Sequence, residues 1–219
     1  MSTATLAIHG GQKTRTKPFT LRTTILKEDI DAAVAVLQSG DISMFFGSPG
    51  EFFLGGPRVK EFEKKWADRY GFKHAITVNS WTTGLMACVG ALGIEPGDEV
   101  LCTPYSMSAT ATSILFYGGI PVFVDIEEKT FNIDPKKIET KITPRTKAIM
   151  LVHLFGHPAA MDEIIAIAKK HNLKIIEDGA HAPGAKYKGK YVGALSDLGG
   201  FSFNYHKHIH AGEGGLIVT

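Results

Sequence analysis

Few features of an exported or membrane-bound protein occur in this sequence. Its 219 residues include only two cysteines, Cys88 and Cys102, and both lie in apolar stretches without a second cysteine at metal or redox spacing. Such thiols are typical of a reducing compartment, so we expect a cytoplasmic protein. No stretch approaches the roughly 20 apolar residues that span a bilayer, and residues 1–12 lack the charged and apolar regions of a signal peptide. We therefore expect no membrane partner.

An excess of charge of either sign is also missing. The sequence has 24 Lys and Arg side chains against 22 Asp and Glu side chains, for a formal net charge of +2. This balance provides no long-range field that would attract nucleic acid. Neither GxGxxG nor GxxxxGKS/T occurs, which excludes the common dinucleotide and Walker loops. These absences favour a small molecule over nucleic acid as the partner.

Short apolar runs alternate with helical patterns along most of the chain. Two early helices are predicted over residues 25–39, ending at Gly40, and from Pro57 to Gly71. Further on, we predict strands over residues 75–78, 100–103, 122–125, 148–153, 174–177 and 200–203, and helices over 82–92, 109–117, 135–141 and 161–171. This alternation predicts an α/β fold with a mainly parallel sheet sandwiched by helices.

The end of the sequence bears on domain organisation. Residues 216–219 have the pattern of a strand, and the sequence stops inside it. We therefore expect a truncated chain, with an N-terminal arm over residues 1–24 and an incomplete ligand-binding domain over residues 25–219. The loop from Met44 to Leu54 is rich in Phe and Gly, and its rings either line a substrate mouth or subunit contact, or cover the edge of the core.

Polar side chains follow the predicted strands, at the sheet edge where parallel sheets bind ligands. Ser80, Trp81 and Thr82 open a helix directly after one strand. The N–H groups of a helix N-terminus can hold a phosphate, although Ser80 taken alone is typical of an ordinary cap. Met107 follows the next strand and can either rest on a flat ligand ring or fill the core.

Two later strands are followed by a carboxylate and by a lysine. Asp178 and His181 come after one of them, and Asp178 either holds a heteroaromatic N–H or caps a turn. Ser202 and Lys207 come with the other. A phosphate cradle, a contact for a flat ring, a carboxylate and a lysine at successive strand ends together indicate a site for pyridoxal phosphate, with Asp178 for the pyridine nitrogen and Lys207 for the aldehyde.

These stretches resemble the DegT family of pyridoxal-phosphate-dependent sugar aminotransferases, which have the fold type I architecture of aspartate aminotransferase. The similarity runs along nearly the whole chain. Its most specific parts are Val-His-Leu-Phe-Gly at 152–156, Glu-Asp-Gly-Ala-His at 177–181, and the stretch 201–215, which runs from Phe-Ser-Phe through Lys207 to Gly-Glu-Gly-Gly. The large, cofactor-binding domain of fold type I is therefore expected over residues 25–219.

The resemblance also implies roles for individual residues. Lys207 is expected to be the catalytic Schiff-base lysine, Asp178 to pair with the pyridinium nitrogen, and His181 to lie near the phenolic oxygen of the cofactor. Thr82 and Ser202 are expected to hold the phosphate. No metal ligand is implied.

Three features depart from the pattern of the family. Trp81, whose backbone is expected to help to hold the phosphate, stands where a small residue is common. Met107 stands where a ring-stacking aromatic residue is common. The loop over residues 44–54 is longer than usual, which suggests an unusual acceptor. The resemblance further implies a homodimer with shared active sites, and a smaller C-terminal domain that this sequence lacks.

The function that we predict is amino transfer from glutamate or glutamine to a nucleotide-linked keto-sugar. A sugar dehydratase of the same family is an alternative, because some relatives have histidine in place of the lysine. A second alternative reads His206, His208 and His210 as metal ligands on one face of a strand. A third is an inactive fragment.

Overall fold

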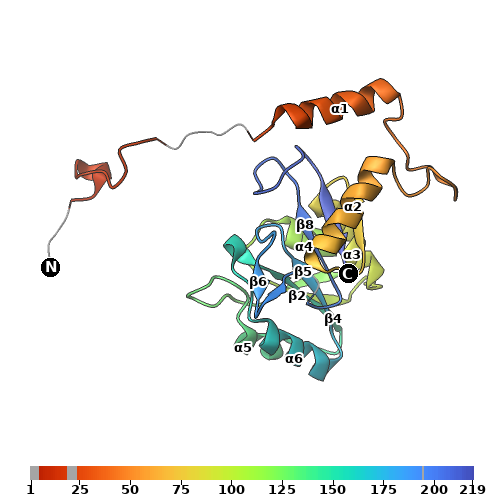
Figure 1. Ribbon diagram of the computed structural model, residues 1–219. Helices are drawn as coiled ribbons and strands as arrows, with labels where there is room; N and C mark the ends of the chain where they lie inside the picture. Colours follow the sequence, from red (N-terminus) through yellow and green to blue (C-terminus); the bar gives the residue numbers. More distant parts are fainter. Residues whose placement is uncertain (1–4, 19–23, 194) are drawn as a thin grey trace. The chain divides into compact units, whose positions relative to one another are not determined.

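The computed structural model describes residues 5–18, 24–193 and 195–219 (Figure 1). Part of the predicted N-terminal arm, residues 1–4 and 19–23, lies outside the described residues. The chain divides into two compact units, Met1–Gly56 and Pro57–Thr219.

The first unit contains a single turn of 3-10 helix, Ala7–His9, and the helix α1, Lys27–Ser39. The predicted helix over residues 25–39 is confirmed, although it begins two residues later than predicted, after Leu26, whose N–H donates to the carboxylate of Asp29 at 2.8 Å. It ends at Gly40, whose φ of 77° favours glycine. No side chain of α1 is buried.

The second unit is a layered α/β domain, which confirms the predicted fold class. Its helices are α2 (Pro57–Tyr70), α3 (Trp81–Ala91), α4 (Ala109–Leu115), α5 (Pro135–Ile138) and α6 (Met161–His171). Its strands are β1 (Ala75–Val78), β2 (Glu99–Cys102), β3 (Ile120–Phe123), β4 (Thr146–Val152), β5 (Lys174–Asp178), β6 (Lys186–Tyr187), β7 (Lys190–Tyr191), β8 (Leu198–Ser202) and β9 (Gly215–Val218).

Seven of these strands form the central sheet, in the order β1-β9-β8-β5-β4-β2-β3. The strands β8, β5, β4, β2 and β3 pair in parallel, and β9 runs antiparallel between β1 and β8. The carboxyl ends of β1, β2, β4, β5 and β8 therefore meet at one edge of the sheet, where ligands of such folds bind.

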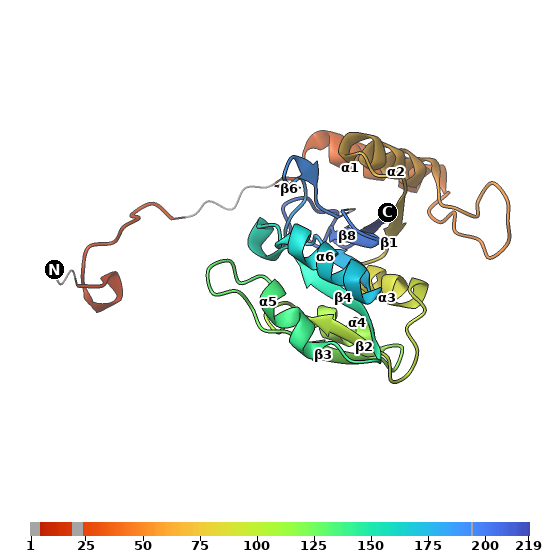
Figure 2. The same cartoon turned by 90° about the horizontal axis from the view of Figure 1, so that it is seen from below.

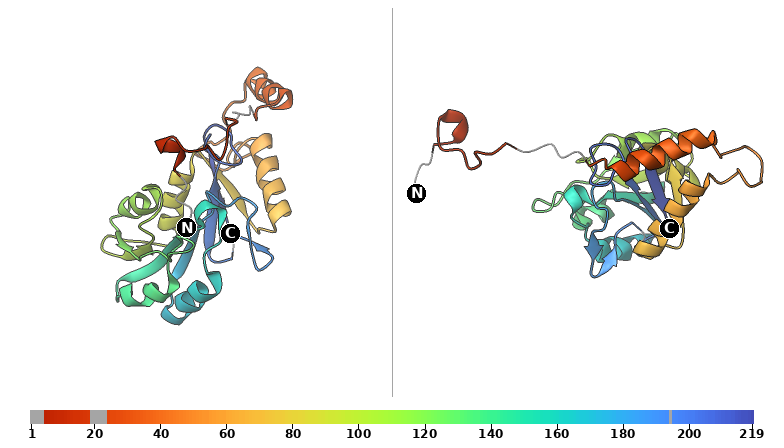
Figure 3. Two further views of the ribbon diagram at one scale, coloured as in Figure 1. Left: turned by 90° about the vertical axis from the view of Figure 1, so that its left-hand side faces the viewer. Right: turned by 45° about the horizontal axis from the view of Figure 1, so that its top comes forward.

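Helices cover both faces of this sheet, and in the left panel of Figure 3 α3 and α4 lie on one side of the strands and α2 and α6 on the other. The core on the α3 side contains Leu85 and Val89 of α3 with Met150 and Ile176 of the sheet. The opposite core is formed by side chains of α5, α6 and the sheet. A separate, largely aromatic cluster lies between α2 and the sheet. Because both faces are covered, the central strands are mainly apolar, and the exceptions include the buried carboxylates of Glu177 and Asp178 at the end of β5.

The predicted strands are confirmed with shifts of one or two residues at their ends. The helix predicted over residues 135–141 is shorter than predicted, because α5 ends at Ile138 and a 3-10 turn, Glu139–Lys141, follows. A two-stranded hairpin of β6 and β7, visible in Figure 2, was not predicted. Its turn places Lys188 and Gly189 at positive φ, 48° and 84°.

None of the helices in the described ranges is long and apolar enough to cross a membrane.

Candidate active site

The carboxyl edge of the sheet encloses a cavity of about 330 Å³. It lies among the segments that follow β1, β2, β5 and β8, so its walls come from parts of the chain that are far apart in sequence. All seven residues that the sequence assigns to the cofactor line it, namely Trp81, Thr82, Met107, Asp178, His181, Ser202 and Lys207. The structure thus places the carboxylate at 178 and the amine at 207 in one cavity.

The first turn of α3 forms one end of the cavity. Ser80 is the N-cap, and its hydroxyl accepts the N–H of Thr83 at 3.2 Å. The N–H groups of Trp81 and Thr82, at the first two helical positions, have no carbonyl to bond inside the helix. They point out of the helix end, where the partial positive charge of the helix favours an anion. The predicted cap and the predicted anion cradle are therefore compatible.

Asp178, the last residue of β5, lies at the floor of the cavity and is 6 % exposed. Its Oδ1 accepts two hydrogen bonds, from the indole N–H of Trp81 at 2.7 Å and from the backbone N–H of Ala180 at 2.9 Å. Burial raises the pKa of this carboxyl above its usual range, against the lowering effect of both donors and of His181 and Lys207. A cation bound against Asp178 would offset this cost.

The raised pKa of Asp178 gives a prediction for the stability of the cofactor-free chain. An acid whose folded-state pKa lies above its unfolded value contributes stability at low pH, and this contribution is lost as the pH rises through the folded pKa. We expect Asp178→Asn to gain stability relative to the unchanged chain as the pH rises from the unfolded pKa of Asp, about 3.9, through the raised folded-state pKa. Urea unfolding of both chains at several pH values measures this difference. A difference that shrinks with rising pH would contradict the assignment.

His181 is the second titratable group in the cavity. Burial lowers its pKa, as do the charges of Lys207 and His208, so the neutral imidazole is favoured. Its Nδ1 accepts the N–H of Phe155 at 3.3 Å, so the ring hydrogen is on Nε2. The ring of Phe155 lies parallel to the imidazole, with centroids 6.1 Å apart. Phe155 therefore fixes both the tautomer and the plane of His181.

Lys207 lies in the turn between β8 and β9, and Asn204 organises that turn. The side-chain oxygen of Asn204 accepts the N–H of His206 at 3.1 Å, and its carbonyl accepts the N–H of Lys207 at 2.8 Å. The side-chain amide donates to Glu213 at 2.8 Å, across the base of the turn. Asn204, His206 and Glu213 also line the cavity, and the sequence interpretation assigned none of the three to the cofactor. An Asn directly after a strand is a turn signal that could have indicated the first of them.

The reading of three histidines as metal ligands on a strand is wrong in its structural premise. Residues 205–209 form turns and bends, because the Asn204 turn reverses the chain before an alternating pattern can form. Within residues 5–18, 24–193 and 195–219, no group of three or more His, Cys, Asp or Glu side chains is arranged to hold a metal ion.

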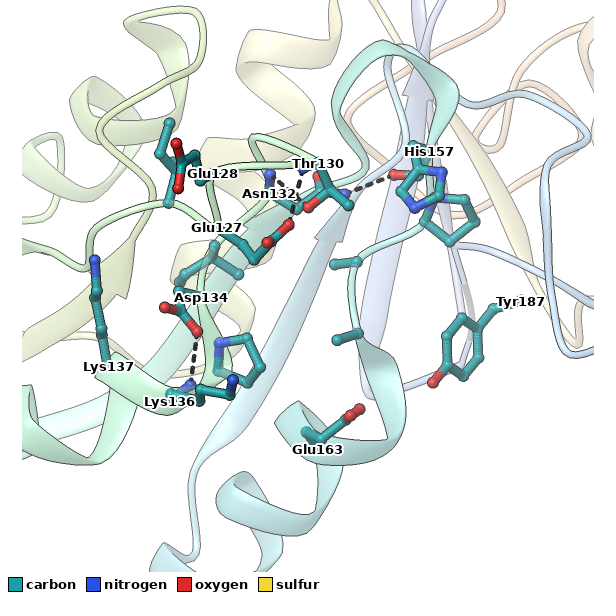
Figure 4. A pocket seen from close by; sticks show the side chains of 16 residues that line it. Glu127, Glu128, Thr130, Asn132, Asp134, Lys136, Lys137, His157, Glu163 and Tyr187 are labelled. Carbon is teal, nitrogen blue, oxygen red and sulfur yellow. Dashed lines mark hydrogen bonds between the residues drawn. The ribbon is translucent and has the colours of Figure 1, made fainter.

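A second hollow, of about 610 Å³, lies between the segment before α5 and the start of α6 (Figure 4). Several of its polar groups are already hydrogen-bonded. Glu127 accepts the N–H of Thr130 at 2.9 Å, the amide of Asn132 donates to the carbonyl of His157 at 3.0 Å, and Asp134 caps α5. None of the seven predicted residues lines this hollow.

Comparison with known proteins identifies the family of this chain. Residues 27–219 match the DegT/DnrJ/EryC1/StrS aminotransferase family. The chain belongs to this family. This membership confirms the resemblance that the sequence motifs indicate. The matched residues include both the predicted sheet and the turn that carries Lys207.

Two curated relatives illustrate the similarity. The spore coat polysaccharide biosynthesis protein SpsC of Bacillus subtilis is 44 % identical over 193 residues, which are 88 % of this chain and 47 % of that protein. GDP-perosamine synthase of Caulobacter vibrioides is 50 % identical over 164 residues, which are 75 % of this chain and 44 % of the synthase. The chain spans about half the length of these relatives.

Solved structures of an aminotransferase and of a dehydratase share the fold. An aminotransferase from Psychrobacter cryohalolentis superposes with a TM-score of 0.85 at 38 % identity and covers 92 % of this chain, which in turn covers 49 % of that structure. The Escherichia coli enzyme GDP-4-keto-6-deoxy-D-mannose-3-dehydratase, solved with bound hydrated pyridoxal phosphate, has a TM-score of 0.80 at 32 % identity, covering 90 % of this chain and 50 % of the dehydratase.

Proposed function

We propose that this chain binds pyridoxal phosphate and belongs to an aminotransferase that moves an amino group from glutamate or glutamine to a nucleotide-linked keto-sugar. The observation that carries the proposal is the joint placement of Asp178 and Lys207 in one cavity, beside a helix N-terminus that can hold an anion. Family membership and the sugar-acting relatives support it.

The residues present fit the cofactor. An N-terminal helix turn whose first two N–H groups have no partner inside the helix, next to the hydroxyls of Thr82 and Ser202, suits a phosphate. The Oδ2 of Asp178 accepts no hydrogen bond from the described residues, and the raised pKa of this buried carboxyl shows that a cationic partner would be favourable. Met107, which is 68 % exposed at the cavity mouth, can lie against the face of the ring.

Each side chain then has a distinct task. When bound, the cofactor supplies an aldehyde that condenses with amines and a ring that draws electrons away from the carbon that carries the amino group. Asp178 would hold a proton on the ring nitrogen, which would keep the ring electron-deficient. The Nε2 hydrogen of His181 would be available to the phenolic oxygen. The Lys207 Nζ would take a proton from Cα of the amino donor and return it.

Amino transfer is favoured over dehydration because a lysine stands at position 207. The dehydratase neighbour shows that this fold also serves deoxysugar formation, and the histidines around Lys207 keep the comparison relevant. Incubating the cofactor-loaded chain with glutamate alone distinguishes an active enzyme from a chain that only binds the cofactor. In an active enzyme, glutamate should convert the visible absorbance of the lysine-linked cofactor to that of its amine form. Adding nucleotide-linked keto-sugars should then yield an amino-sugar by mass spectrometry. A deoxysugar product would favour the dehydratase.

We further propose a cytoplasmic homodimer with shared active sites. Cys88 and Cys102 are buried and unpaired, and burial raises the pKa of each thiol to about 12, so neither is reactive and a reducing compartment suits both. Tyr105 and Phe155 expose 48 % and 69 % of their surface next to the cavity, which fits a second subunit there. Light scattering on the purified chain tests the dimer.

A further inference from the structure

The indole of Trp81 makes a contact that no feature of the sequence announces. Trp81 begins α3 and Asp178 ends β5, 97 positions apart, yet the indole N–H donates to Oδ1 of Asp178 at 2.7 Å. Both side chains are almost fully buried, with exposures of 5 % and 6 %. A hydrogen bond to a charged group is strongest in such surroundings, because little water competes for either partner.

The two hydrogen-bond donors to Asp178 bond the same carboxylate oxygen. The indole of Trp81 and the N–H of Ala180 both bond Oδ1, at 2.7 and 2.9 Å. No described residue donates to Oδ2. A carboxylate with one oxygen held by two fixed donors cannot rotate freely about its side chain, so Oδ2 has a defined direction and remains the oxygen available to a ligand.

Packing fixes the indole itself. A Cβ at Gly84, one turn further along α3, would come within 2.6 Å of Cε3 of Trp81. A Cβ at Gly200 of β8 would overlap the far edge of the same ring. Gly200 is the register partner of Asp178, so the indole lies over β8 with its N–H facing the end of β5. Only glycine at these two positions leaves room for the ring.

The other tryptophan of the chain shows that a buried indole does not require such a partner. Trp66 of α2 is 6 % exposed, and its N–H has no hydrogen-bond partner among the described residues. It packs within an aromatic cluster with Phe201 and Phe203. The bond of Trp81 is therefore a property of its position above Asp178.

We propose that Trp81 is a positioning residue for Asp178, whose indole N–H holds Oδ1 and so directs Oδ2 toward the ring nitrogen of the cofactor. The inference deepens the proposed function, on which its cofactor step rests. It gives the bulky residue at 81 a task that a backbone contact to phosphate does not explain.

Other charged and titratable groups also face Asp178. These are Cys88 on α3, His181 on the loop after β5, and Lys207 on the turn after β8. Any test of the bond between Trp81 and Asp178 must separate its effect from theirs. Removal of the indole donor withdraws one of the two bonds that lower the pKa of Asp178, so the neutral carboxyl becomes more favourable and the hold on a protonated ring nitrogen weaker.

Indole N–H resonances of the cofactor-free chain test the bond directly, because the sequence has only two tryptophans. With 15N-labelled tryptophan, assigned through Trp66→Phe, we expect the Trp81 signal to lie downfield of the Trp66 signal and to move upfield as Asp178 becomes protonated. Asp178→Asn should abolish this titration, and His181→Gln should preserve it. A Trp81 signal that does not titrate, or that titrates equally in Asp178→Asn, would overturn the proposal.

Cofactor binding tests the consequence. We expect Trp81→Phe to weaken the affinity for pyridoxal phosphate by about 10- to 100-fold, as for loss of a hydrogen bond to a charged group. Gly84→Ala should displace the indole and weaken the affinity by a smaller factor. Gly90→Ala is the matched control, because it crowds the Tyr117 hydroxyl from the same helix, away from Asp178.

The outcomes separate the two proposals. Equal affinity in Trp81→Phe and in the unchanged chain would overturn the positioning role. A chain whose Trp81 signal titrates with Asp178 but which binds no pyridoxal phosphate would support the positioning of the carboxylate and contradict the proposed function.

Discussion

Replacing Lys207 with alanine is expected to abolish the visible absorbance that pyridoxal phosphate acquires when it is linked to lysine. The cofactor should still bind, because the helix turn at Trp81 and Thr82 and the carboxylate of Asp178 remain. Amino transfer should fall by about 10²- to 10⁴-fold from the loss of the proton-transferring amine alone. Absorbance spectra and the glutamate half-reaction measure the two effects.

Lys190→Ala provides the matched control for this substitution. Lys190 is an exposed lysine of β7 and does not line the cavity. Its replacement should leave both the spectrum and the half-reaction unchanged. If Lys207→Ala kept the visible band, or if Lys190→Ala removed it, the assignment of the lysine would be wrong.

Truncating Glu177 to alanine is expected to lower the free energy of unfolding more than Glu177→Gln or a surface substitution does. The carboxylate is fully buried beside His153, with Oε2 bonded to the imidazole Nε2 at 3.0 Å and to the N–H of Gly193 at 2.8 Å, and with Oε1 accepting the hydroxyl of Ser196 at 2.7 Å. Nδ1 of His153 accepts the N–H of Ala159, so Nε2 carries the hydrogen that Glu177 accepts. Glu177→Ala leaves these donors without an acceptor.

Loss of one partner from such a buried network costs about 3–5 kcal/mol of unfolding free energy. Urea unfolding measures this loss, and Asp68→Ala, which removes an exposed ion pair with Lys64, should change the stability little. Glu177→Gln keeps the shape and some of the hydrogen bonds and should be destabilised less than Glu177→Ala. A loss in Glu177→Ala no larger than in Asp68→Ala would contradict the account.

The same carboxylate predicts a dependence on pH. Although burial raises the pKa of Glu177, its bonds to His153, Gly193 and Ser196 outweigh burial and hold the pKa below its usual range. A depressed folded-state pKa contributes stability above the unfolded pKa, and this stability is lost as the pH falls through the folded pKa. Glu177 and Asp178 therefore act in opposite directions, although they are neighbours on one strand.

Much of the fold could be predicted from the sequence because the buried strands are mainly apolar and each is followed by a turn or a helix start. The cavity could be predicted for a related reason. Polar residues at the end of an apolar strand, as at Asp178, or in the turn that follows one, as at Lys207, lie at the edge where strand ends meet. Local pattern and global topology agree there.

What could not be predicted depends on contacts across the fold. The bond between Trp81 and Asp178 joins residues 97 positions apart, and nothing near Trp81 in sequence indicates it. The stack of Phe155 on His181 is of the same kind. The hairpin of β6 and β7 was missed because two strands of two residues are too short for an alternating pattern.

Reduction of the cofactor-loaded chain with borohydride, followed by peptide mass spectrometry, tests the central claim most directly. Reduction makes the link between the cofactor and its lysine permanent, so that the modified peptide can be located. The account predicts one pyridoxyl adduct per chain, on the peptide that contains Lys207. An adduct on a different lysine, or no adduct in a chain that has bound the cofactor, would contradict it.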